Sequence, residues 1–379
     1  MKNTSFIIVF AGGGSGGHVY PTIGVIEALH KKATELDVPL RMVRMGPRDG
    51  FDTLFTNQGV AISPIMTGKV RRYAALANFI DIPKLFIGFL QALFKLFFIM
   101  PDVIFSKGGT GALPVVVAGW FYRIPVAIHE SDTKPGLTNL FSARFAKKVF
   151  VGYEGAAHYF NAAKTEVVGT PIRTELTADK TTKALAKETL GFASSEPLTL
   201  ILGASQGSTR LNDFILANLG ELIKVTQIMH QTGTANFAEV QKLSRAALMD
   251  GSFKNRYQPI GYFEKSMGLA LTAADVVVAR PGANTIAEIA AFGVPAILIP
   301  IAESANGHQR VNAYDFAKNG AAVVIEEPNL LPGIFLSELK TILGDPDRLA
   351  KMSAASTKFF IPDAAEKIAQ GLFLLAAKS

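Results

Sequence analysis

The chain reads FIIVFAGGGSGGHVYPTIGVIEAL over residues 6–29. An apolar run typical of a buried strand leads into a glycine-rich loop at residues 12–18, and a helix with proline in its first turn follows. This order leaves several backbone N–H groups at one spot, with the positive end of the helix dipole behind them. The stretch therefore predicts a Rossmann-like α/β unit that binds an anion at this loop.

The same strand, glycine loop and helix pattern recurs later in the chain. Residues 102–111 read DVIFSKGGTG, and residues 198–208 read LTLILGASQGS after a polar segment. We therefore predict an α/β protein with two tandem Rossmann-like domains that face a cleft. The predicted domains span residues 1–170 and 171–360, and a last helix within 361–379 can pack on either of them.

Composition and charge narrow the class of protein. The chain has 379 residues, of which 49% are hydrophobic and none is cysteine, so disulfides and thiolate chemistry are excluded. Residues 1–173 carry 19 Lys+Arg and 11 Asp+Glu, whereas residues 174–379 carry 19 and 20. A basic first half suits lipid headgroups or phosphorylated substrates, and without a lysine-rich tail or an aromatic-basic motif we expect no nucleic-acid partner. The apolar run at the N-terminus ends in the glycine loop, so we expect a first strand and a cytoplasmic protein.

Residues 79–100, FIDIPKLFIGFLQALFKLFFIM, form an unusually apolar segment. A membrane-spanning helix needs about 20 predominantly apolar residues, and the polar residues within this segment argue against spanning. Two interpretations remain: a buried helix of the α/β layer, or an interfacial helix that inserts phenylalanines into one leaflet. Nearby basic residues favour contact with an anionic membrane surface through the 69–100 region, namely Arg71, Arg72, Lys84 and Lys95.

Polar residues after the strands of the second half are suited to a nucleotide. Arg280 and the helix N-terminus after Ala283 are predicted to neutralise a diphosphate leaving group, and Glu288 to accept hydrogen bonds from ribose hydroxyls. A reaction between two phosphorylated substrates then needs no metal and no cofactor. The pair Asp345 and Asp347 is interpreted as a helix cap rather than a metal site.

An ordered set of motifs between about Ile7 and Glu326 resembles the MurG family of bacterial peptidoglycan glycosyltransferases: GGGSGGHVYP, SKGGTGALP, VVGTPIRT, LILGASQGSTRLN, RPGANTIAEIAAFGVPAILIPI and GHQRVNA. The resemblance implies a GT-B fold and inverting transfer of N-acetylglucosamine from UDP-GlcNAc to the muramyl C4 hydroxyl of undecaprenyl-diphosphate-muramyl-pentapeptide (lipid I), which gives lipid II. It also implies metal-independent chemistry and peripheral attachment to the cytoplasmic face of the cell membrane.

The resemblance also implies roles for individual residues. His18 is the expected general base, although a histidine in this place can also merely support the loop. Gly14, Gly108 and Gly109 are expected to hold the diphosphate of the lipid acceptor. The expected donor contacts are Ser15, Gly16, Gly17, Asp132, Arg173, Ser205, Phe263, Ala283, Asn284, Thr285, Ile286, Ala287, Glu288 and Gln309.

Three positions depart from the family pattern. Asp132 and Thr170 stand where the family usually has asparagine, and His308 stands where it has glutamine. A carboxylate at position 132 accepts a hydrogen bond from a sugar hydroxyl but cannot donate one as an amide does. The departures therefore bear on the choice of donor sugar.

Three alternatives remain open. Residues 203–207 match the G-x-S-x-G elbow of α/β-hydrolases, with Asp275 and His308 in the required order, but this leaves the first 170 residues unexplained. The G-x-G-x-x-G at residues 12–17 fits a dinucleotide enzyme, but Arg44 stands near the position of the expected acidic residue, which suits NADP at best. A GT-B glycolipid transferase with a diacylglycerol acceptor is the third alternative.

Overall fold

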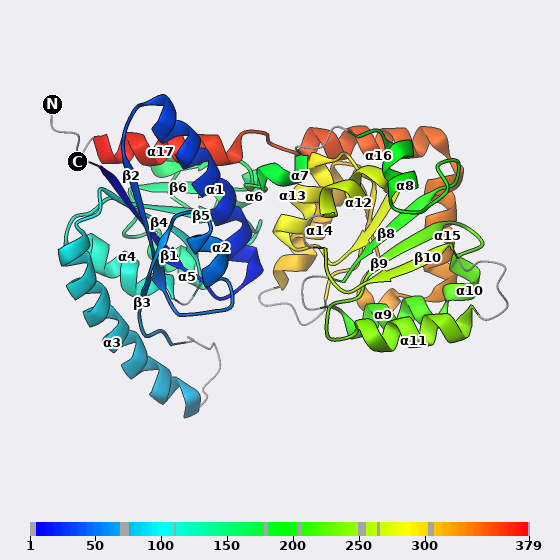
Figure 1. Cartoon of the computed structure of the whole chain (residues 1–379), viewed down its shortest axis with the longest axis horizontal. Helices are drawn as coiled ribbons and strands as arrows, with labels where there is room; N and C mark the ends of the chain where they lie inside the picture. Colours follow the sequence, from blue (N-terminus) through cyan, green and yellow to red (C-terminus); the bar gives the residue numbers. More distant parts are fainter. Residues whose placement is uncertain are drawn as a thin grey trace. The chain divides into compact units, whose positions relative to one another are not determined.

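The protein, represented by a computed structural model, consists of two compact units (Figure 1). The structure describes residues 5–68, 76–109, 111–177, 181–203, 207–248, 255–263, 266–301 and 307–377. The first unit combines Met1–Arg173 with Ile361–Ser379, and the second is Thr174–Phe360. Residues 171–173, which the sequence analysis assigns to the second domain, thus belong to the first unit in this division.

The first unit is built on a parallel sheet of seven strands in the order β3-β2-β1-β4-β5-β6-β7. The chain moves outward from β1 in one direction and then crosses to β4 on the other side of β1. The boundary between β1 and β4 is therefore the switch point at which open α/β sheets bind ligands. The strands are β1 (Phe6–Gly12), β2 (Leu40–Gly46), β3 (Ala61–Pro64), β4 (Val103–Gly108), β5 (Val126–Glu130), β6 (Lys148–Val151) and β7 (Thr165–Val167).

Alternating side chains of β1 point to opposite faces of this sheet, and each face has its own core. Ile8 and Phe10 pack under α1 and α17, whereas Val9 and Ala11 pack under α3 and α4. Burial on both faces explains why the strand is a continuous apolar run. The helices are α1 (Gly16–Glu35), α2 (Asp52–Thr56), α3 (Leu76–Ile99), α4 (Ala112–Phe121), α5 (Leu137–Ser142), α6 (Glu154–Ala157), η1 (Ala162–Lys164) and α17 (Ala364–Ala377).

The last helix, α17, lies beside α1 and completes the core of the first unit (Figure 1). Ile368 and Leu372 are fully buried in this core, and the ring of Phe373 stacks on Phe6 with centroids 4.2 Å apart. A Cβ on Gly371 would lie 2.5 Å from Cζ of Phe150, so only glycine allows the helix to approach the sheet this closely. The end of the chain is thus packed into the domain formed by its beginning.

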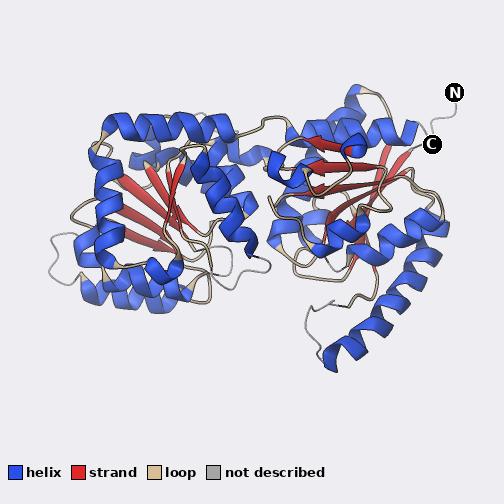
Figure 2. Cartoon of the chain, turned by 180° about the vertical axis from the view of Figure 1, so that it is seen from behind, coloured by secondary structure: helices blue, strands red, loops and turns tan. Residues whose placement is uncertain are grey.

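The second unit repeats the design with a parallel sheet of six strands in the order β10-β9-β8-β11-β12-β13 (Figure 2). Its switch point lies between β8 and β11. Asp345 accepts a hydrogen bond from the N–H of Arg348 at 3.0 Å, which confirms the predicted helix cap.

The strands of the second unit are β8 (Leu198–Leu202), β9 (Gln227–Gln231), β10 (Tyr257–Ile260), β11 (Val276–Ala279), β12 (Ala296–Leu298) and β13 (Ala322–Val324). Helices flank this sheet (Figure 2). They are α7 (Thr174–Thr177), α8 (Lys183–Thr189), α9 (Thr209–Ala217), α10 (Leu219–Leu222), α11 (Phe237–Ala247), α12 (Met267–Ala273), α13 (Ala283–Ala291), α14 (His308–Lys318), η3 (Glu327–Asn329), α15 (Pro332–Gly344) and α16 (Pro346–Phe359).

Helix α3 is the apolar segment singled out in the sequence, and it is buried on one face only. Ala92 and Leu96 are fully buried against the sheet and α4. The opposite face exposes Ile82, Phe86, Ile87, Leu90, Phe94, Phe97 and Phe98. Among the described residues, the stretch Asp81–Ile99 is long and apolar enough to cross a membrane by length and composition alone. Its buried face, however, makes α3 a packed part of the first unit.

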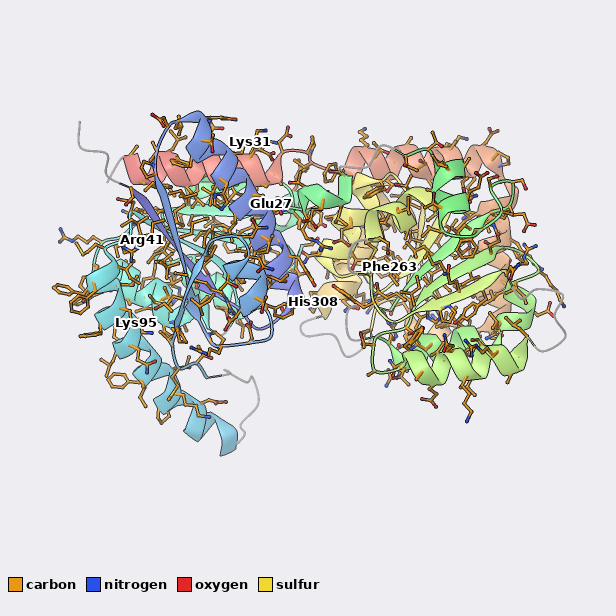
Figure 3. The ribbon with its side chains drawn as sticks, viewed as in Figure 1. Glu27, Lys31, Arg41, Lys95, Phe263 and His308 are labelled. Carbon is orange, nitrogen blue, oxygen red and sulfur yellow. The ribbon has the colours of Figure 1, made fainter. Side chains whose placement is uncertain are left out.

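The basic residues near α3 are placed differently from the expectation. The ammonium of Lys95 (labelled in Figure 3) donates to the carbonyl of Pro64 at 2.5 Å, so it is bound to the protein and not directed at a lipid phosphate. Lys84 is partly exposed and lies 3.8 Å from Asp81. Arg71 and Arg72 lie outside the described residues.

We predict that Leu372→Ala lowers the free energy of unfolding of the first unit by about 2–5 kcal/mol, the usual cost of such a cavity. The control Leu374→Ala changes an exposed residue (53% against 0% for Leu372) of the same helix, so it should stay within about 0.5 kcal/mol. Guanidinium unfolding followed by the fluorescence of Trp120, the one tryptophan of the chain, reports on this unit. Equal effects of the two substitutions would contradict the packing described for α17.

Candidate functional site

The residues expected around the first glycine loop meet at the carboxyl edge of the first sheet. The neighbouring strands β1, β4 and β5 end at this edge, and the loops that follow them begin there. Gly12, Gly13 and Gly14 have φ values of +116°, +157° and +97°, which L side chains rarely adopt. A Cβ on Gly12 would lie 2.5 Å from the carbonyl oxygen of Gly108. The two glycine loops therefore touch each other at the switch point.

His18 lies in the first turn of α1, between these loops. Its Nδ1 is 3.1 Å from Oγ of Ser15, the residue before the helix. A Cβ on Gly109 would lie 3.3 Å from the same nitrogen, so glycine at 109 lets the loop after β4 pass close to the imidazole. The structure thus brings together His18, Ser15 and Gly109.

The electrostatic environment keeps His18 neutral. Burial and, to a smaller extent, the ammonium of Lys107 lower its pKa to about 4, and the carboxylate of Asp132 opposes part of this shift. At neutral pH the imidazole is therefore unprotonated. A neutral imidazole beside an anion-binding loop can accept a proton from a substrate hydroxyl.

The N–H of Gly14 already has a partner in this structure. It donates to Oδ2 of Asp49 at 2.9 Å. Asp49 and Asp52 both bind the guanidinium of Arg44, whose side chain is only 1% exposed. This differs from the expectation of a Gly14 N–H that faces the acceptor diphosphate: a carboxylate of the chain itself occupies this place.

The loop after β5 is organised by the buried carboxylate of Glu130. Its oxygens accept hydrogen bonds from the N–H of Asp132 at 2.9 Å, the N–H of Gly136 at 3.0 Å and Nδ2 of Asn139 at 3.0 Å. Burial raises the pKa of Glu130, the charge of Asp132 raises it further, and these hydrogen bonds oppose the shift. Asp132 is half-buried at the start of this loop.

Arg280 has a different role from the one expected from the sequence. Its guanidinium is buried and donates to Oγ of Ser208 at 2.9 Å, to the carbonyl of Ile299 at 2.9 Å and to the carboxylate of Glu327. These three partners follow β8, β12 and β13, respectively. Arg280 therefore braces the carboxyl edge of the second sheet, and its charge is paired with Glu327 rather than left for a diphosphate.

The expected donor contacts of the second half lie along the same edge. Helix α13 begins at Ala283, where Asn284, Thr285 and Glu288 are half-buried, and Ile286 and Ala287 face the core. Gln309 lies in the first turn of α14, next to His308 (labelled in Figure 3), and its Oε1 accepts the N–H of Ile301 at 3.1 Å. Phe263 follows β10 and is buried. Ser205 lies outside the described residues.

The remaining expected donor contacts fall in the first unit. Ser15, Gly16 and Gly17 begin α1, and the guanidinium of Arg173 lies 4.6 Å from the ring centroid of Tyr20 in the same helix. The expected residues therefore form two sets, one at the carboxyl edge of each sheet. Among the described residues no group of three or more His, Asp or Glu side chains could hold a metal ion.

Comparison with known proteins identifies the family. Residues 8–151 match the glycosyltransferase family 28 N-terminal domain, and residues 198–368 match the glycosyltransferase family 28 C-terminal domain. Two relatives carry the name UDP-N-acetylglucosamine–N-acetylmuramyl-(pentapeptide) pyrophosphoryl-undecaprenol N-acetylglucosamine transferase. The one from Treponema denticola is 34% identical over 92% of both chains, and the one from Clostridium kluyveri is 34% identical over 95% of this chain and 97% of its own. The chain belongs to the MurG family of glycosyltransferases.

Solved structures agree with this MurG-family fold. The crystal structure of MurG from Acinetobacter baumannii matches with a TM-score of 0.75 at 23% identity, over 97% of this chain and 99% of that chain. UDP-GlcNAc 2-epimerase from Neisseria meningitidis matches with a TM-score of 0.67 at 14% identity, over 98% and 100% of the two chains. The predicted fold class, two Rossmann-like domains of the GT-B type, is confirmed.

The geometry of this MurG-family chain argues against two alternatives. Asp275 precedes β11 and binds Lys183 and Lys187 at the amino edge of the sheet, whereas the glycine loop at residues 203–207 follows the carboxyl end of β8. Asp275 therefore lies at the opposite edge of the sheet from the end of β8 that leads into the G-x-S-x-G stretch, which argues against a hydrolase triad. Arg44 is buried and bound to two aspartates, so it is not available for the 2′-phosphate of NADP.

Sequence reasoning missed Lys107 and Asp49. Lys107 is only 5% exposed, ends β4 with Gly108, and donates to Oγ of Ser131. The signal was a lysine directly before Gly-Gly at the end of an apolar strand. Asp49 offered no comparable signal, because its contact with Gly14 joins two loops that follow different strands.

We predict that Gly109→Ala displaces the imidazole of His18. The new Cβ would lie 3.1 Å from the carbonyl of Gly13 and 3.3 Å from Nδ1 of His18, at a φ of +83°. The free energy of unfolding should fall by about 1–3 kcal/mol, and the NMR signals of the His18 ring should shift. Gly136→Ala, where the Cβ would meet open space, is the control. Unchanged His18 signals in Gly109→Ala would contradict the close approach.

Proposed function

We propose that this chain transfers N-acetylglucosamine from UDP-GlcNAc to the C4 hydroxyl of undecaprenyl-diphosphate-muramyl-pentapeptide, which converts lipid I into lipid II in peptidoglycan synthesis. The observation that carries the proposal is the neutral His18, which lies against Gly109 and under the influence of Asp132 at the switch point of a MurG-family chain. The names of the two relatives supply the substrate classes.

The carboxyl edge of the first sheet, where His18 lies in the first turn of α1, is the acceptor edge, at which the proton is transferred. Oxygen O4 of the muramyl sugar attacks the anomeric carbon of the donor while its proton passes to the imidazole of His18. The new bond joins O4 to the anomeric carbon, the bond from that carbon to the diphosphate oxygen breaks, and UDP leaves with both bonding electrons. Attack opposite the leaving group inverts the anomeric centre.

The carboxyl edge of the second sheet, where α13 and α14 begin, is the donor edge, and it holds the nucleotide. The N-terminus of α13 offers backbone N–H groups and a positive dipole end to the diphosphate, so charge that develops on UDP is stabilised without a metal ion. Glu288 accepts hydrogen bonds from ribose hydroxyls, and Gln309 contributes from α14. Arg280 keeps the loops of this edge in register through Ser208, Ile299 and Glu327.

We also propose that the first unit docks peripherally on the cytoplasmic face of an anionic membrane. The exposed face of α3 is continuous with aromatic residues at the end of α4. The ring centroids of Phe97 and Tyr122 are 6.4 Å apart, and those of Tyr122 and Phe121 are 5.2 Å apart. Trp120 and Phe121 are exposed, and the exposed Arg123 and Arg144 supply basic charge nearby. Such a surface inserts aromatic rings into one leaflet while arginines contact phosphates.

The enzyme assay is transfer of labelled N-acetylglucosamine from UDP-GlcNAc to a short-chain lipid I analogue, with EDTA present. We expect product from the wild type and a loss of about a hundredfold or more in His18→Ala, the scale of a general base. His30→Ala is the matched control, because His30 lies in the same helix and contacts the carbonyl of Gln58 away from the site.

The outcomes of this assay separate the alternatives. Equal product from His18→Ala and the wild type would keep the reaction and reject His18 as the base. No product from the wild type, with transfer to diacylglycerol instead, would replace the acceptor by that of a related glycolipid transferase.

For the membrane we predict that Phe94→Ser/Phe97→Ser binds phosphatidylglycerol vesicles at least tenfold more weakly than the wild type. Withdrawing each ring from the apolar phase costs about 1.5–3 kcal/mol, and the two rings are 68% and 57% exposed. Leu243→Ser/Leu331→Ser removes exposed apolar residues of the second unit and should bind normally. Cosedimentation measures all three proteins, and equal binding of the first variant and the wild type would reject docking through α3.

A further inference from the structure

Lys107 is a buried cation at the centre of the acceptor edge. It is carried by β4, next to the glycine-loop strand β1, and lines the same small pocket as His18, Gly12 and Gly13. Its hydrogen-bond partner is the neutral hydroxyl of Ser131. Burying an ammonium group is costly unless nearby charges compensate for the lost water. An apolar side chain would fill the same space without this cost, so a role for the charge itself is to be sought.

The carboxylates that compensate Lys107 come from the loop after β5. Burial lowers the pKa of Lys107, Glu130 and Asp132 oppose this shift, and the resulting pKa of about 8 keeps the ammonium form as the main form at neutral pH. Glu130 in turn holds the N–H groups of Asp132 and Gly136. Lys107 thus stabilises the ionised state of the carboxylate that shapes this loop.

Charged groups face His18 from several elements. Lys107 approaches from β4 and Asp132 from the loop after β5, and these two have opposite effects on the imidazole. Arg44 of β2 lines the same pocket, but Asp49 and Asp52 pair its charge. His129 of β5 is buried and bonded to the carbonyl of Gly169, and its pKa lies well below the usual value because of burial and Lys107. Lys107 is therefore the cation that acts most directly on His18.

We propose that Lys107 is a positioning residue of the acceptor site: its buried ammonium lines the same pocket as His18 and, through Ser131 and Glu130, holds the loop that carries Asp132. The inference rests on the proposed function, in which His18 accepts a proton. A positive charge nearby disfavours the imidazolium form, and the low dielectric of the buried edge strengthens the effect.

The test is the pKa of His18 in the full chain without substrates, measured by NMR titration of the imidazole. Lys107→Met should raise this pKa by about one pH unit, the effect of removing one nearby like charge, and Lys107→Arg, which keeps the charge, should leave it nearly unchanged. Lys148→Met is the control, because it removes a lysine from β6 that is paired with Glu166.

The pH profile of transfer supplies a second readout. In Lys107→Met the acid limb of kcat/KM should move to higher pH by the same amount as the pKa of His18, because activity requires the unprotonated imidazole. At pH values above this limb the rate should recover, which a general loss of structure would not allow. Lys107→Met leaves the buried carboxylate of Glu130 without a nearby cation, which can prevent folding. In that case the double variant Lys107→Met/Glu130→Gln removes this carboxylate as well and permits the same titration.

An unchanged pKa of His18 in a folded variant without the Lys107 charge would overturn the proposal. A rate loss that is uniform over pH, with an unchanged pKa, would instead assign Lys107 to the binding of the acceptor phosphates and would also overturn it. The titration needs no substrate. Its result therefore stands even if the wild type transfers no N-acetylglucosamine, so failure of the proposed function is distinguishable from failure of this inference.

Discussion

The close contact between the loops after β1 and β4 is the constraint on which the acceptor site depends. A side chain at Gly12 would lie 2.5 Å from the carbonyl oxygen of Gly108, so the two strands can end side by side only if this position is glycine. The contact places the first turn of α1 against Gly109, and His18 is brought to the edge of the sheet. The glycines thus act by permitting close approach as much as by offering N–H groups to an anion.

Each unit has a buried cation beside its switch point, Lys107 in the first unit and Arg280 in the second. Lys107 ends β4 and Arg280 follows β11, and both strands lie across the switch point from the strand that carries the glycine loop. Arg280 is fully engaged by Ser208, Ile299 and the carboxylate of Glu327, which makes it a brace. Lys107 donates to the hydroxyl of Ser131 and has no ion pair with a carboxylate among the described residues, and its charge lowers the pKa of the neighbouring imidazole. The groups that a buried cation binds therefore decide whether it mainly holds loops together or mainly shifts the pKa of a neighbouring side chain.

Most of the fold could be predicted from local patterns, because long apolar runs followed by glycine loops appear in the sequence itself. The edge strands β10 and β13 escaped sequence analysis, since they are short and partly exposed. The same limit applies to side chains. His18 was found through its place in a loop motif. The hydrogen bond from the N–H of Gly14 to Asp49 joins residues 35 positions apart, and neither segment contains a sequence pattern that predicts it.

The sequence by itself determined the two Rossmann-like domains, their glycine loops and the family, because these depend on periodicity, backbone freedom and the order of motifs. Only the tertiary structure decided which charges are buried and what they contact. Lys95 binds a backbone carbonyl instead of facing outward, and Arg280 pairs with Glu327, 47 residues away. The physical reason is that desolvation and Coulomb energies depend on distances between atoms of different elements, and these distances exist only after the sheets have assembled.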